Sequence, residues 1–333
     1  MKKILFIPPG IQNGWYMENH YEYIIRGLSD EFFIEQAQVP YPPFENFLDR
    51  YPETNPLERN PEEYDLIVPL LPSHSGVPPT PEWFKKMAIV MYEPGEGHSA
   101  VANTLAGATP VADSADYGGR KCWPVRFGVD TAIYKPYPMV REDNLLHVGV
   151  LGSHATPRRM IVEAITPLFD LEGVRIMIFP SPWVNNGGEP PLIEALGGKE
   201  FLNRCVSGNK RGVGVANMYN QLDVLIRCDA SYGYSFPVME AAACGVPVIA
   251  TDCGIDHFIT EAGGGILIEG NPLRFINDSD ELRDKVRESV IWMRDHPRER
   301  IAMGKAARLE IESNWTWEKH IPAWRKFLRE ATK

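Results

Sequence analysis

One stretch of this chain, residues 228–254, constrains the fold more than any other and reads CDASYGYSFPVMEAAACGVPVIATDCG. It continues a short apolar run, 224–228, that is typical of a buried strand. A loop with the turn-forming Gly233 follows, and then Pro237, which suits the first turn of a helix because it lacks a backbone N–H. Gly245 ends the predicted helix, and residues 247–251 begin another strand. This alternation predicts an α/β fold with a parallel sheet.

Glu240 is the anomaly of this stretch, because the predicted helix around it consists of Val, Met, Ala and Cys. A carboxylate in apolar surroundings needs a hydrogen-bonding partner or a ligand with hydroxyl donors. We expect it in the first turn of the helix. There it either binds a ligand, or caps its own helix and bonds neighbouring amides. The residues alone leave both interpretations open.

The same stretch resembles the C-terminal half of a GT-B glycosyltransferase, specifically of glycosyltransferase family 4. The signature of that family runs Glu, Gly, Phe, Gly, Leu, Pro, two residues, Glu, Ala, a run of small residues and Gly-x-Pro-Val. The positions that fit are Gly233, Tyr234, Pro237, Glu240, Ala241, Gly245, Pro247 and Val248. Two positions depart from it, because Tyr232 stands where the family has its first Glu and Ser235 where it has the second Gly.

The resemblance implies a site for a nucleoside-diphosphate-sugar donor. Glu240 would accept hydrogen bonds from the ribose hydroxyls, and N–H groups of the loop 234–236 would meet the diphosphate. The Glu that Tyr232 replaces faces the sugar ring in the family, and Asp229 is a carboxylate that can substitute for it. For Tyr232 itself, packing on the loop is the favoured role. The expected donor residues in this stretch are Asp229, Tyr232, Gly233, Tyr234, Ser235, Phe236 and Glu240, the last also counted as catalytic.

A second match lies at residues 123–136 (WPVRFGVDTAIYKP), which are similar to the segment Ile-Pro-Asn-Gly-Val-Asp-Thr, Phe-x-Pro that ends the first domain in this family. The resemblance therefore implies two Rossmann-like, doubly wound domains that face a cleft. We expect the first at 1–138 plus 316–333, because the final helix of such folds crosses back, and the second at 139–315. Further expected strands lie at 4–7, 32–39, 64–71, 88–92, 109–112, 145–151 and 263–269, and further helices at 18–28, 280–296, 298–312 and 317–331.

A leaving nucleoside diphosphate needs cations, because it carries about two negative charges and a helix N-terminus offsets them by only about 0.3 to 1 kcal/mol. The family supplies an Arg and a Lys after the first strand of its second domain. Here Val150 occupies the Arg position, and we place Arg158 first for the Lys role. Each candidate cation also fits a solvated surface charge. The rest of this loop and the rival cations are Gly152, Ser153, Arg159, Lys210, Arg211 and Arg227.

Loops after the strands of the first domain are expected to bind the acceptor, because ligands bind at the carboxyl ends of strands in open α/β sheets. Gly14 follows the first strand, His74 follows the strand at 64–71, and Glu96 and His98 follow the strand at 88–92. His98 or Glu96 would act on the acceptor hydroxyl. The alternative is that these are ordinary surface residues, as a lone loop His or Glu often is.

Composition sets further bounds. The 333 residues are 44% hydrophobic, enough for two cores, and no stretch approaches the roughly 20 apolar residues of a membrane helix. Five cysteines without metal-ligand spacing favour reduced thiols and a cytoplasmic location. A net charge of −10 argues against long-range attraction to nucleic acid. We expect no metal, and no cofactor beyond the nucleotide-sugar co-substrate.

Together these features predict a metal-independent hexosyl- or pentosyltransferase. By resemblance, it would move a sugar from a nucleoside diphosphate to an acceptor hydroxyl with retention at the anomeric carbon. The acceptor can be a saccharide, a small hydroxylated metabolite or a modified nucleobase, which is the one way nucleic acid would take part. Two other interpretations stay open: a sugar-nucleotide epimerase or hydrolase on the same fold, and a non-catalytic nucleotide-sugar binding protein.

Overall fold

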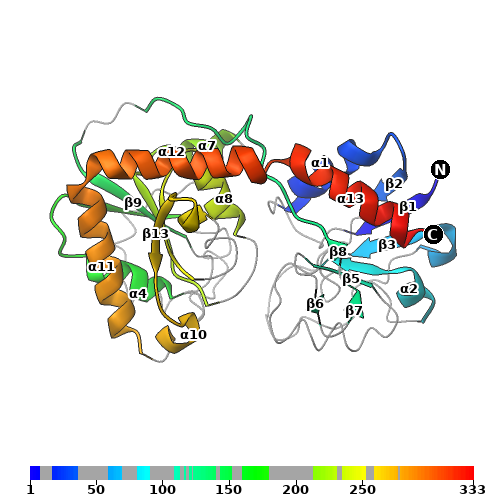
Figure 1. Cartoon of the computed structure of the whole chain (residues 1–333), viewed down its shortest axis with the longest axis horizontal. Helices are drawn as coiled ribbons and strands as arrows, with labels where there is room; N and C mark the ends of the chain where they lie inside the picture. The colour runs from blue at the N-terminus through cyan, green and yellow to red at the C-terminus, as the bar shows by residue number, and fades with distance from the viewer. Residues whose placement is uncertain are drawn as a thin grey trace. The chain divides into compact units, whose positions relative to one another are not determined.

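The computed structural model of the chain describes residues 1–7, 17–36, 59–69, 81–90, 109–112, 116–117, 120–121, 123–139, 143–151, 160–179, 213–230, 235–252, 259–276 and 278–333. These residues divide into two compact units (Figure 1). One unit is Met1–Gly128 with Trp317–Lys333, and the other is Val129–Thr316. Each has a sheet of parallel strands with helices packed on it, so the predicted α/β class is confirmed.

The first unit is built on short parallel strands. Its elements are β1 (Lys3–Ile7), α1 (Met17–Leu28), β2 (Phe33–Gln36), η1 (Pro61–Glu63), β3 (Leu66–Pro69), α2 (Pro81–Lys86), β4 (Ala88–Val90), β5 (Thr109–Ala112), β6 (Asp116–Tyr117), β7 (Arg120–Lys121), β8 (Trp123–Pro124) and α13 (Trp317–Ala331). Parallel strands run in the orders β2-β1-β3 and β4-β5-β8, and a bridge between Ile67 and Met87 sets β4 beside β3. Residues 4–7 of β1 are fully buried, as expected of a central parallel strand covered on both faces.

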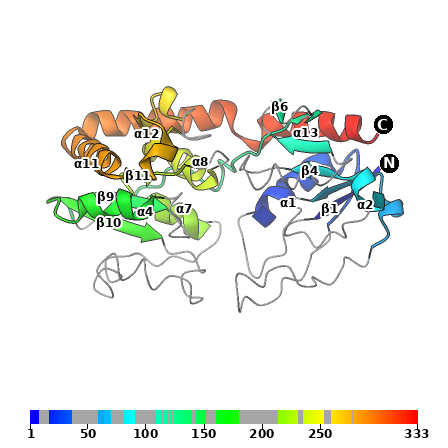
Figure 2. The same ribbon diagram turned by 90° about the horizontal axis from the view of Figure 1, so that it is seen from below.

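Helix α13 belongs to the first unit although it follows the second in sequence. It lies beside α1 (Figures 1 and 2). The ring of Trp324 lies 6.4 Å from that of Phe6 and 5.5 Å from that of Phe127, and its indole N–H donates to the carbonyl oxygen of Arg126 at 2.8 Å. The helix fits here because side chains at helical spacing face the core, namely Trp317, His320, Trp324, Phe327 and Leu328.

The second unit carries a five-stranded parallel sheet in the order β10-β9-β11-β12-β13. Its elements are β9 (Leu146–Leu151), α4 (Ile161–Ile165), η4 (Thr166–Leu168), β10 (Val174–Phe179), α7 (Val213–Tyr219), β11 (Val224–Arg227), α8 (Phe236–Ala243), β12 (Val248–Thr251), β13 (Gly265–Ile268), α10 (Pro272–Phe275), α11 (Asp280–Asp295) and α12 (Pro297–Asn314). The chain winds from β9 outward to β10, and then returns to β11 and the strands beyond. This is a doubly wound sheet whose direction of winding reverses between β9 and β11.

Helix α8 ends where α12 crosses it. Gly245 has a φ of +77°, in the left-handed region that favours glycine, so it ends α8 as the sequence predicts. A Cβ added to Gly304 of α12 would lie 2.1 Å from the carbonyl oxygen of Gly245. The guanidinium of Arg308, also on α12, donates to the carbonyl oxygen of Ala243 in the last turn of α8. Two glycines and one arginine thus fix the end of α8 against α12.

Residues 129–139 pack in the second unit, whereas the sequence placed the boundary near residue 138. Val129 forms a parallel bridge with Thr316, just before α13 begins. The backbone N–H of Tyr137 donates to Oδ1 of Asn220 at 2.7 Å, next to the end of α7. These contacts hold the segment on the second unit, and the first unit therefore ends at residue 128.

Candidate functional site

The candidate site lies at the carboxyl ends of β9 and β11 in the second unit. Open α/β sheets bind ligands where the winding direction reverses, and in this sheet that point lies between these two strands. Helix α8 follows β11 and begins at this edge of the sheet. It carries Glu240 as its fifth residue. Glu240 therefore lies in the second turn, whereas it was predicted in the first turn.

Two tyrosines lie at the carboxylate of Glu240. Glu240 is buried, with 6% of the residue exposed. The hydroxyl of Tyr219, at the end of α7, donates to Oε2 of Glu240 at 2.9 Å. The side chain of Tyr134, in the turn at 131–134, lies beside this carboxylate and lowers its pKa. The two tyrosine rings lie 6.2 Å apart, so polar side chains from two elements converge on one buried acid.

Burial raises the pKa of Glu240 to about 7, although Tyr134 and Tyr219 act in the opposite direction. Burial and the nearby charge of Glu240 raise the pKa of both tyrosines above the usual value of 10. Burial likewise raises the pKa of the Cys244 thiol to about 12. The tyrosines therefore stay protonated near neutral pH and can donate to the carboxylate.

The proposal that Glu240 caps its own helix is wrong. The residue lies beyond the first turn of α8, and its carboxylate lies against side chains of two other elements. An ionised carboxylate has about four lone-pair positions, and the tyrosines occupy at most about two of them. The group can therefore accept further hydrogen bonds from a ligand that reaches it.

The N-terminus of α8 is suited to an anion. Its N-cap residue, Ser235, is buried, and its side chain makes no capping hydrogen bond. The first N–H groups of a helix have no partners within the helix, and the helix dipole favours negative charge there. Phosphate groups bind such helix ends in many α/β folds. Ser235 and Phe236 thus lie at a helix N-terminus, and the diphosphate expected beside them stays a prediction.

An ion pair marks the end of β11. Nη2 of Arg227 lies 3.2 Å from Oδ2 of Asp229, and these side chains are only 12% and 8% exposed. The backbone of Asp229 is fixed to β12, because its N–H donates to the hydroxyl of Thr251 at 2.9 Å and its carbonyl accepts from that hydroxyl at 2.6 Å. Ile226 of β11 pairs with Val150 of β9, the residue at the family's arginine position. Arg227 therefore lies on the neighbouring strand, one residue beyond the level of that position.

The structure brings Asp229, Ser235 and Phe236 to one edge of the sheet, with Glu240 buried one helical turn further along α8. The remaining predicted site residues lie outside the described residues. They are Gly14, His74, Glu96, His98, Gly152, Ser153, Arg158, Arg159, Lys210, Arg211, Tyr232, Gly233 and Tyr234.

Sequence reasoning missed both tyrosines around Glu240. Tyr134 stands at the Phe position of the family's Phe-x-Pro segment, so a hydroxyl where the family has a plain phenyl ring was the available signal. Tyr219 carried no such signal, because a tyrosine at the end of a helix is ordinary. Only the packing of α7 against α8 brings it to the carboxylate.

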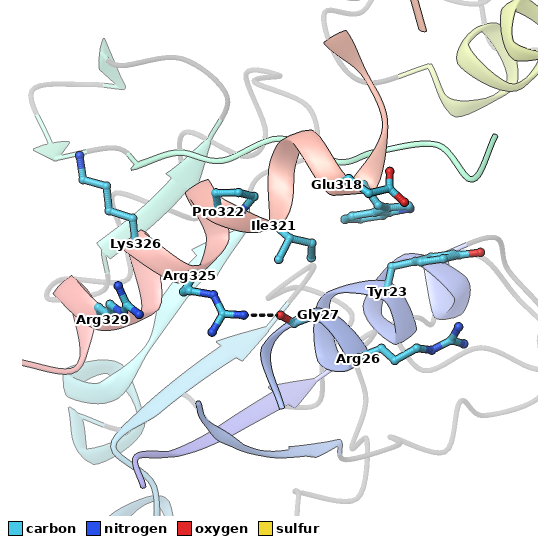
Figure 3. Close-up of a pocket in the computed structure, with 10 residues that line it drawn as sticks. Tyr23, Arg26, Gly27, Glu318, Ile321, Pro322, Arg325, Lys326 and Arg329 are labelled. Atoms are coloured by element: carbon cyan, nitrogen blue, oxygen red, sulfur yellow. Dashed lines mark hydrogen bonds between the residues drawn. The ribbon is translucent and has the colours of Figure 1, made fainter. Parts of the chain in front are cut away.

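A pocket of about 720 Å³ lies in the first unit, between α1 and α13 (Figure 3). Two of its basic lining residues are engaged by acids or a carbonyl: Arg325 donates to the carbonyl oxygen of Gly27 at 2.7 Å and pairs with Asp30, and Arg329 pairs with Glu31. None of the residues predicted for the site lines it.

In the part of the chain that the structure describes, no group of three or more His, Cys, Asp and Glu residues is placed to hold a metal ion. None of the helices there is both long and apolar enough to cross a membrane.

Comparison with known sequences finds relatives for parts of the chain. A GDP-mannose-dependent monoacylated alpha-(1-6)-phosphatidylinositol monomannoside mannosyltransferase of Corynebacterium glutamicum is 39% identical over 87 residues, which are 26% of this chain and 20% of that protein. A D-inositol 3-phosphate glycosyltransferase of Paenarthrobacter aurescens is 28% identical over 119 residues, 35% of this chain and 26% of that protein. The matches thus span a fifth to about a quarter of the length of these relatives.

Two solved structures resemble nearly the whole chain. Sucrose-phosphate synthase from Thermosynechococcus elongatus has a TM-score of 0.71 at 14% identity and covers 99% of each chain. HepE of Anabaena, in complex with UDP-glucose, has a TM-score of 0.71 at 15% identity and covers 99% of this chain and 100% of the other. At such identities the likeness shows the fold, and the predicted GT-B fold is confirmed.

The family comparison matches the part of the chain that builds the candidate site. A family described as glycosyl transferase-like matches residues 158–326, slightly more than half of the 333 residues. This range includes β11, the ion pair at its end, α8 and Glu240. The chain therefore belongs to the glycosyl transferase-like family and has the GT-B fold.

Proposed function

We propose that this chain transfers a sugar from a nucleoside-diphosphate-sugar to an acceptor hydroxyl, with retention at the anomeric carbon. One observation carries the proposal: Glu240, on the helix that begins at the ligand-binding edge of the sheet, is buried, and its carboxylate is bonded by the Tyr219 hydroxyl with Tyr134 beside it. Membership in the family supports the same class of donor. A buried carboxylate with free lone pairs suits the neighbouring hydroxyls of a ribose.

In this proposal the donor lies along the edge of the second sheet. Glu240 accepts hydrogen bonds from the ribose, the N-terminus of α8 binds the diphosphate, and Asp229 faces the sugar. Arg158 remains the first candidate for neutralising the leaving group. Arg227 is a structurally supported rival, because Asp229 holds its guanidinium at the end of β11. On the acceptor side, His98 and Glu96 remain the proposed groups.

The reaction breaks the bond between the anomeric carbon and the diphosphate oxygen and forms one to the acceptor oxygen on the same face of the sugar. The nucleoside diphosphate leaves with the electron pair of the broken bond, and the acceptor hydroxyl loses its proton. The protein contributes mainly position and charge, because both partners are bound in advance and the leaving group is anionic.

The names of the relatives suggest which substrates to try first. One relative is GDP-mannose-dependent, and HepE was solved with UDP-glucose. Both sequence relatives are named for acceptors that contain inositol. We therefore propose a polyol or saccharide acceptor rather than a modified nucleobase, and a hexose as the donor sugar.

The test is product analysis by mass spectrometry. Purified protein is incubated with GDP-mannose and UDP-glucose, alone and with inositol phosphate or a saccharide, with Glu240→Gln as the matched variant. The proposal expects acceptor plus one hexose, formed by the parent and strongly reduced in the variant, with the anomeric configuration of the donor kept in the NMR spectrum. Free hexose or an epimerised nucleotide without acceptor would indicate the hydrolase or epimerase. Tight binding of nucleotide with no product would indicate a non-catalytic binding protein.

A further inference from the structure

The carboxylate of Glu240 is flanked on two sides by residues of different elements. Tyr219 is buried and closes α7, whereas Tyr134 is partly exposed and lies in the turn at 131–134. Tyr219 donates a hydrogen bond to this acid at 2.9 Å, and the Tyr134 side chain lies on another side of it, with its ring 6.2 Å from that of Tyr219. A buried carboxylate with a single partner can rotate about its last side-chain bond. A second polar group on another side restricts that rotation.

The two elements that carry these tyrosines are tied together. Asn220, directly after Tyr219, donates its amide Nδ2 to the carbonyl oxygen of Lys135 at 3.0 Å, and its Oδ1 accepts the backbone N–H of Tyr137 at 2.7 Å. One side chain therefore clamps the end of α7 to the residues that follow Tyr134. The distance between the two hydroxyls is set by this clamp and not by the flexibility of either segment.

The turn of Tyr134 is also supported from within and from behind. Oδ1 of Asp130 accepts the backbone N–H groups of Ala132 at 2.7 Å and Ile133 at 3.2 Å, which closes the turn. Arg308 of α12 donates to the backbone carbonyl of Tyr134 and to that of Ala243 in α8. One guanidinium thus joins the turn to the helix that carries Glu240. Supporting contacts of this kind are what a precisely placed binding group requires.

We propose that Tyr134 and Tyr219 are positioning residues for the donor nucleotide, which hold the Glu240 carboxylate in the orientation that receives the two ribose hydroxyls. This inference rests on the ribose role proposed above for Glu240. The tyrosines act through Glu240 and touch no substrate themselves. Without them the carboxylate would stay buried but would lose both its fixed orientation and part of its compensation for burial.

A dependence on pH follows from the same geometry. Ribose hydroxyls donate to the ionised carboxylate, so nucleotide affinity rises as the pH rises through the pKa of Glu240, which is about 7. Each tyrosine lowers that pKa, so loss of one hydroxyl moves the midpoint of the affinity profile to higher pH. The other titratable or charged groups around this cluster are Asp130, Lys135, Cys244 and Arg308.

The experiment measures the Kd of UDP and GDP by calorimetry from about pH 6 to about pH 9 on the parent protein, Tyr134→Phe and Tyr219→Phe. Each substitution removes one hydroxyl and keeps the ring. We expect about tenfold weaker binding at neutral pH, as for loss of one charge-assisted hydrogen bond, together with a midpoint shifted to higher pH. Tyr137→Phe is the matched control, because its hydroxyl donates to the carbonyl oxygen of Ile133 at 3.3 Å and not to Glu240. It is expected to match the parent.

Glu240→Gln separates this inference from the function on which it rests. The dependence of its Kd on pH is also the baseline for the other variants. The terminal phosphate of UDP or GDP takes up a proton near about pH 6, and this changes the affinity of every variant. If Glu240→Gln binds as tightly as the parent, the ribose role is wrong. If it binds weakly while both Tyr→Phe variants keep the parent's Kd and midpoint, the ribose role stands and the positioning role is overturned. Tyr134→Phe decides the case if Tyr219→Phe fails to fold, because Tyr134 is partly exposed and its family position is a phenylalanine.

Discussion

At the residue scale, the protein tolerates an acid where an apolar side chain would be more stable. Glu240 ionises near pH 4.5 in an unfolded chain but near pH 7 in the folded one. The folded state therefore holds more protons between these values, and the contribution of Glu240 to the free energy of unfolding falls as the pH rises from about 4.5 to about 7. Residues that carry function are often kept at such a cost in stability.

The first prediction concerns Glu240→Gln. Between about pH 4.5 and pH 7 the parent is expected to lose about 2 to 3 kcal/mol of unfolding free energy that the variant keeps, because each unit of pKa shift corresponds to about 1.4 kcal/mol. Urea denaturation at about pH 5 and about pH 8 measures the difference. Parallel losses in the two proteins would show that Glu240 ionises normally in the folded chain.

A second prediction at this scale concerns His320 of α13, which is mostly buried. Burial, and then the positive charge of Arg126, lower its pKa from 6.5 to about 4. The unfolded chain therefore binds more protons between these values, and the free energy of unfolding falls as the pH drops from about 6.5 to about 4. The loss is expected to reach about 3 kcal/mol and to be absent in His320→Gln. Thermal melts of both proteins across this range decide it, and equal slopes would contradict the assignment.

At the scale of elements, the packing of α12 against α8 determines where Glu240 is presented. The third prediction is that Gly304→Ala destabilises the protein by about 1 to 3 kcal/mol, because its new Cβ meets the backbone oxygen of Gly245, which cannot move aside as a side chain can. Lys305→Ala, exposed on the same helix, is the control and should stay within about 0.5 kcal/mol of the parent. A Gly304→Ala protein as stable as the control would show that the two helices are less closely packed.

Most elements could be predicted from sequence, because their signals are local. The helix at 317–331 and the strand at 109–112 have the predicted bounds, and Pro237 and Gly245 mark the start and end of α8. After the strand at 145–151 the sequence also predicts a helix that ends at residue 169. The α-helix there ends at Ile165, because Pro167 lacks the N–H that would continue it and the chain tightens into η4. The edge strand β10 was missed although Gly173 precedes it and Pro180 follows it, because Arg175 interrupts its apolar run.

The candidate site was less predictable than the fold. Glu240 stood out from the sequence because a lone acid in an apolar helix is anomalous, and this signal is local. The partners of Glu240 are not local, since Tyr134 lies more than a hundred residues before it, and only the tertiary packing of the turn, α7 and α8 makes them neighbours. The ion pair of Arg227 with Asp229 was missed for a different reason: the two residues were considered separately for different roles.

At the scale of the whole molecule, the function proposed above places the nucleotide on the second unit, where protein groups would neutralise its leaving diphosphate. The fourth prediction is that sugar transfer survives EDTA, because cationic side chains and the N-terminus of α8 neutralise the leaving group. Activity is measured with the donor and acceptor found by product analysis, before and after chelation. Activity abolished by EDTA and restored by Mg²⁺ or Mn²⁺ would mean that a cation bridges the diphosphate.

The measurement that tests the central claim most directly is a crystal structure of the protein with bound UDP or GDP. The account predicts ribose hydroxyls within about 3 Å of the Glu240 carboxylate, with Tyr134 and Tyr219 still beside it, and the diphosphate at the N-terminus of α8. A nucleotide bound elsewhere, for example in the pocket between α1 and α13, with Glu240 in contact with the tyrosines alone, would contradict it.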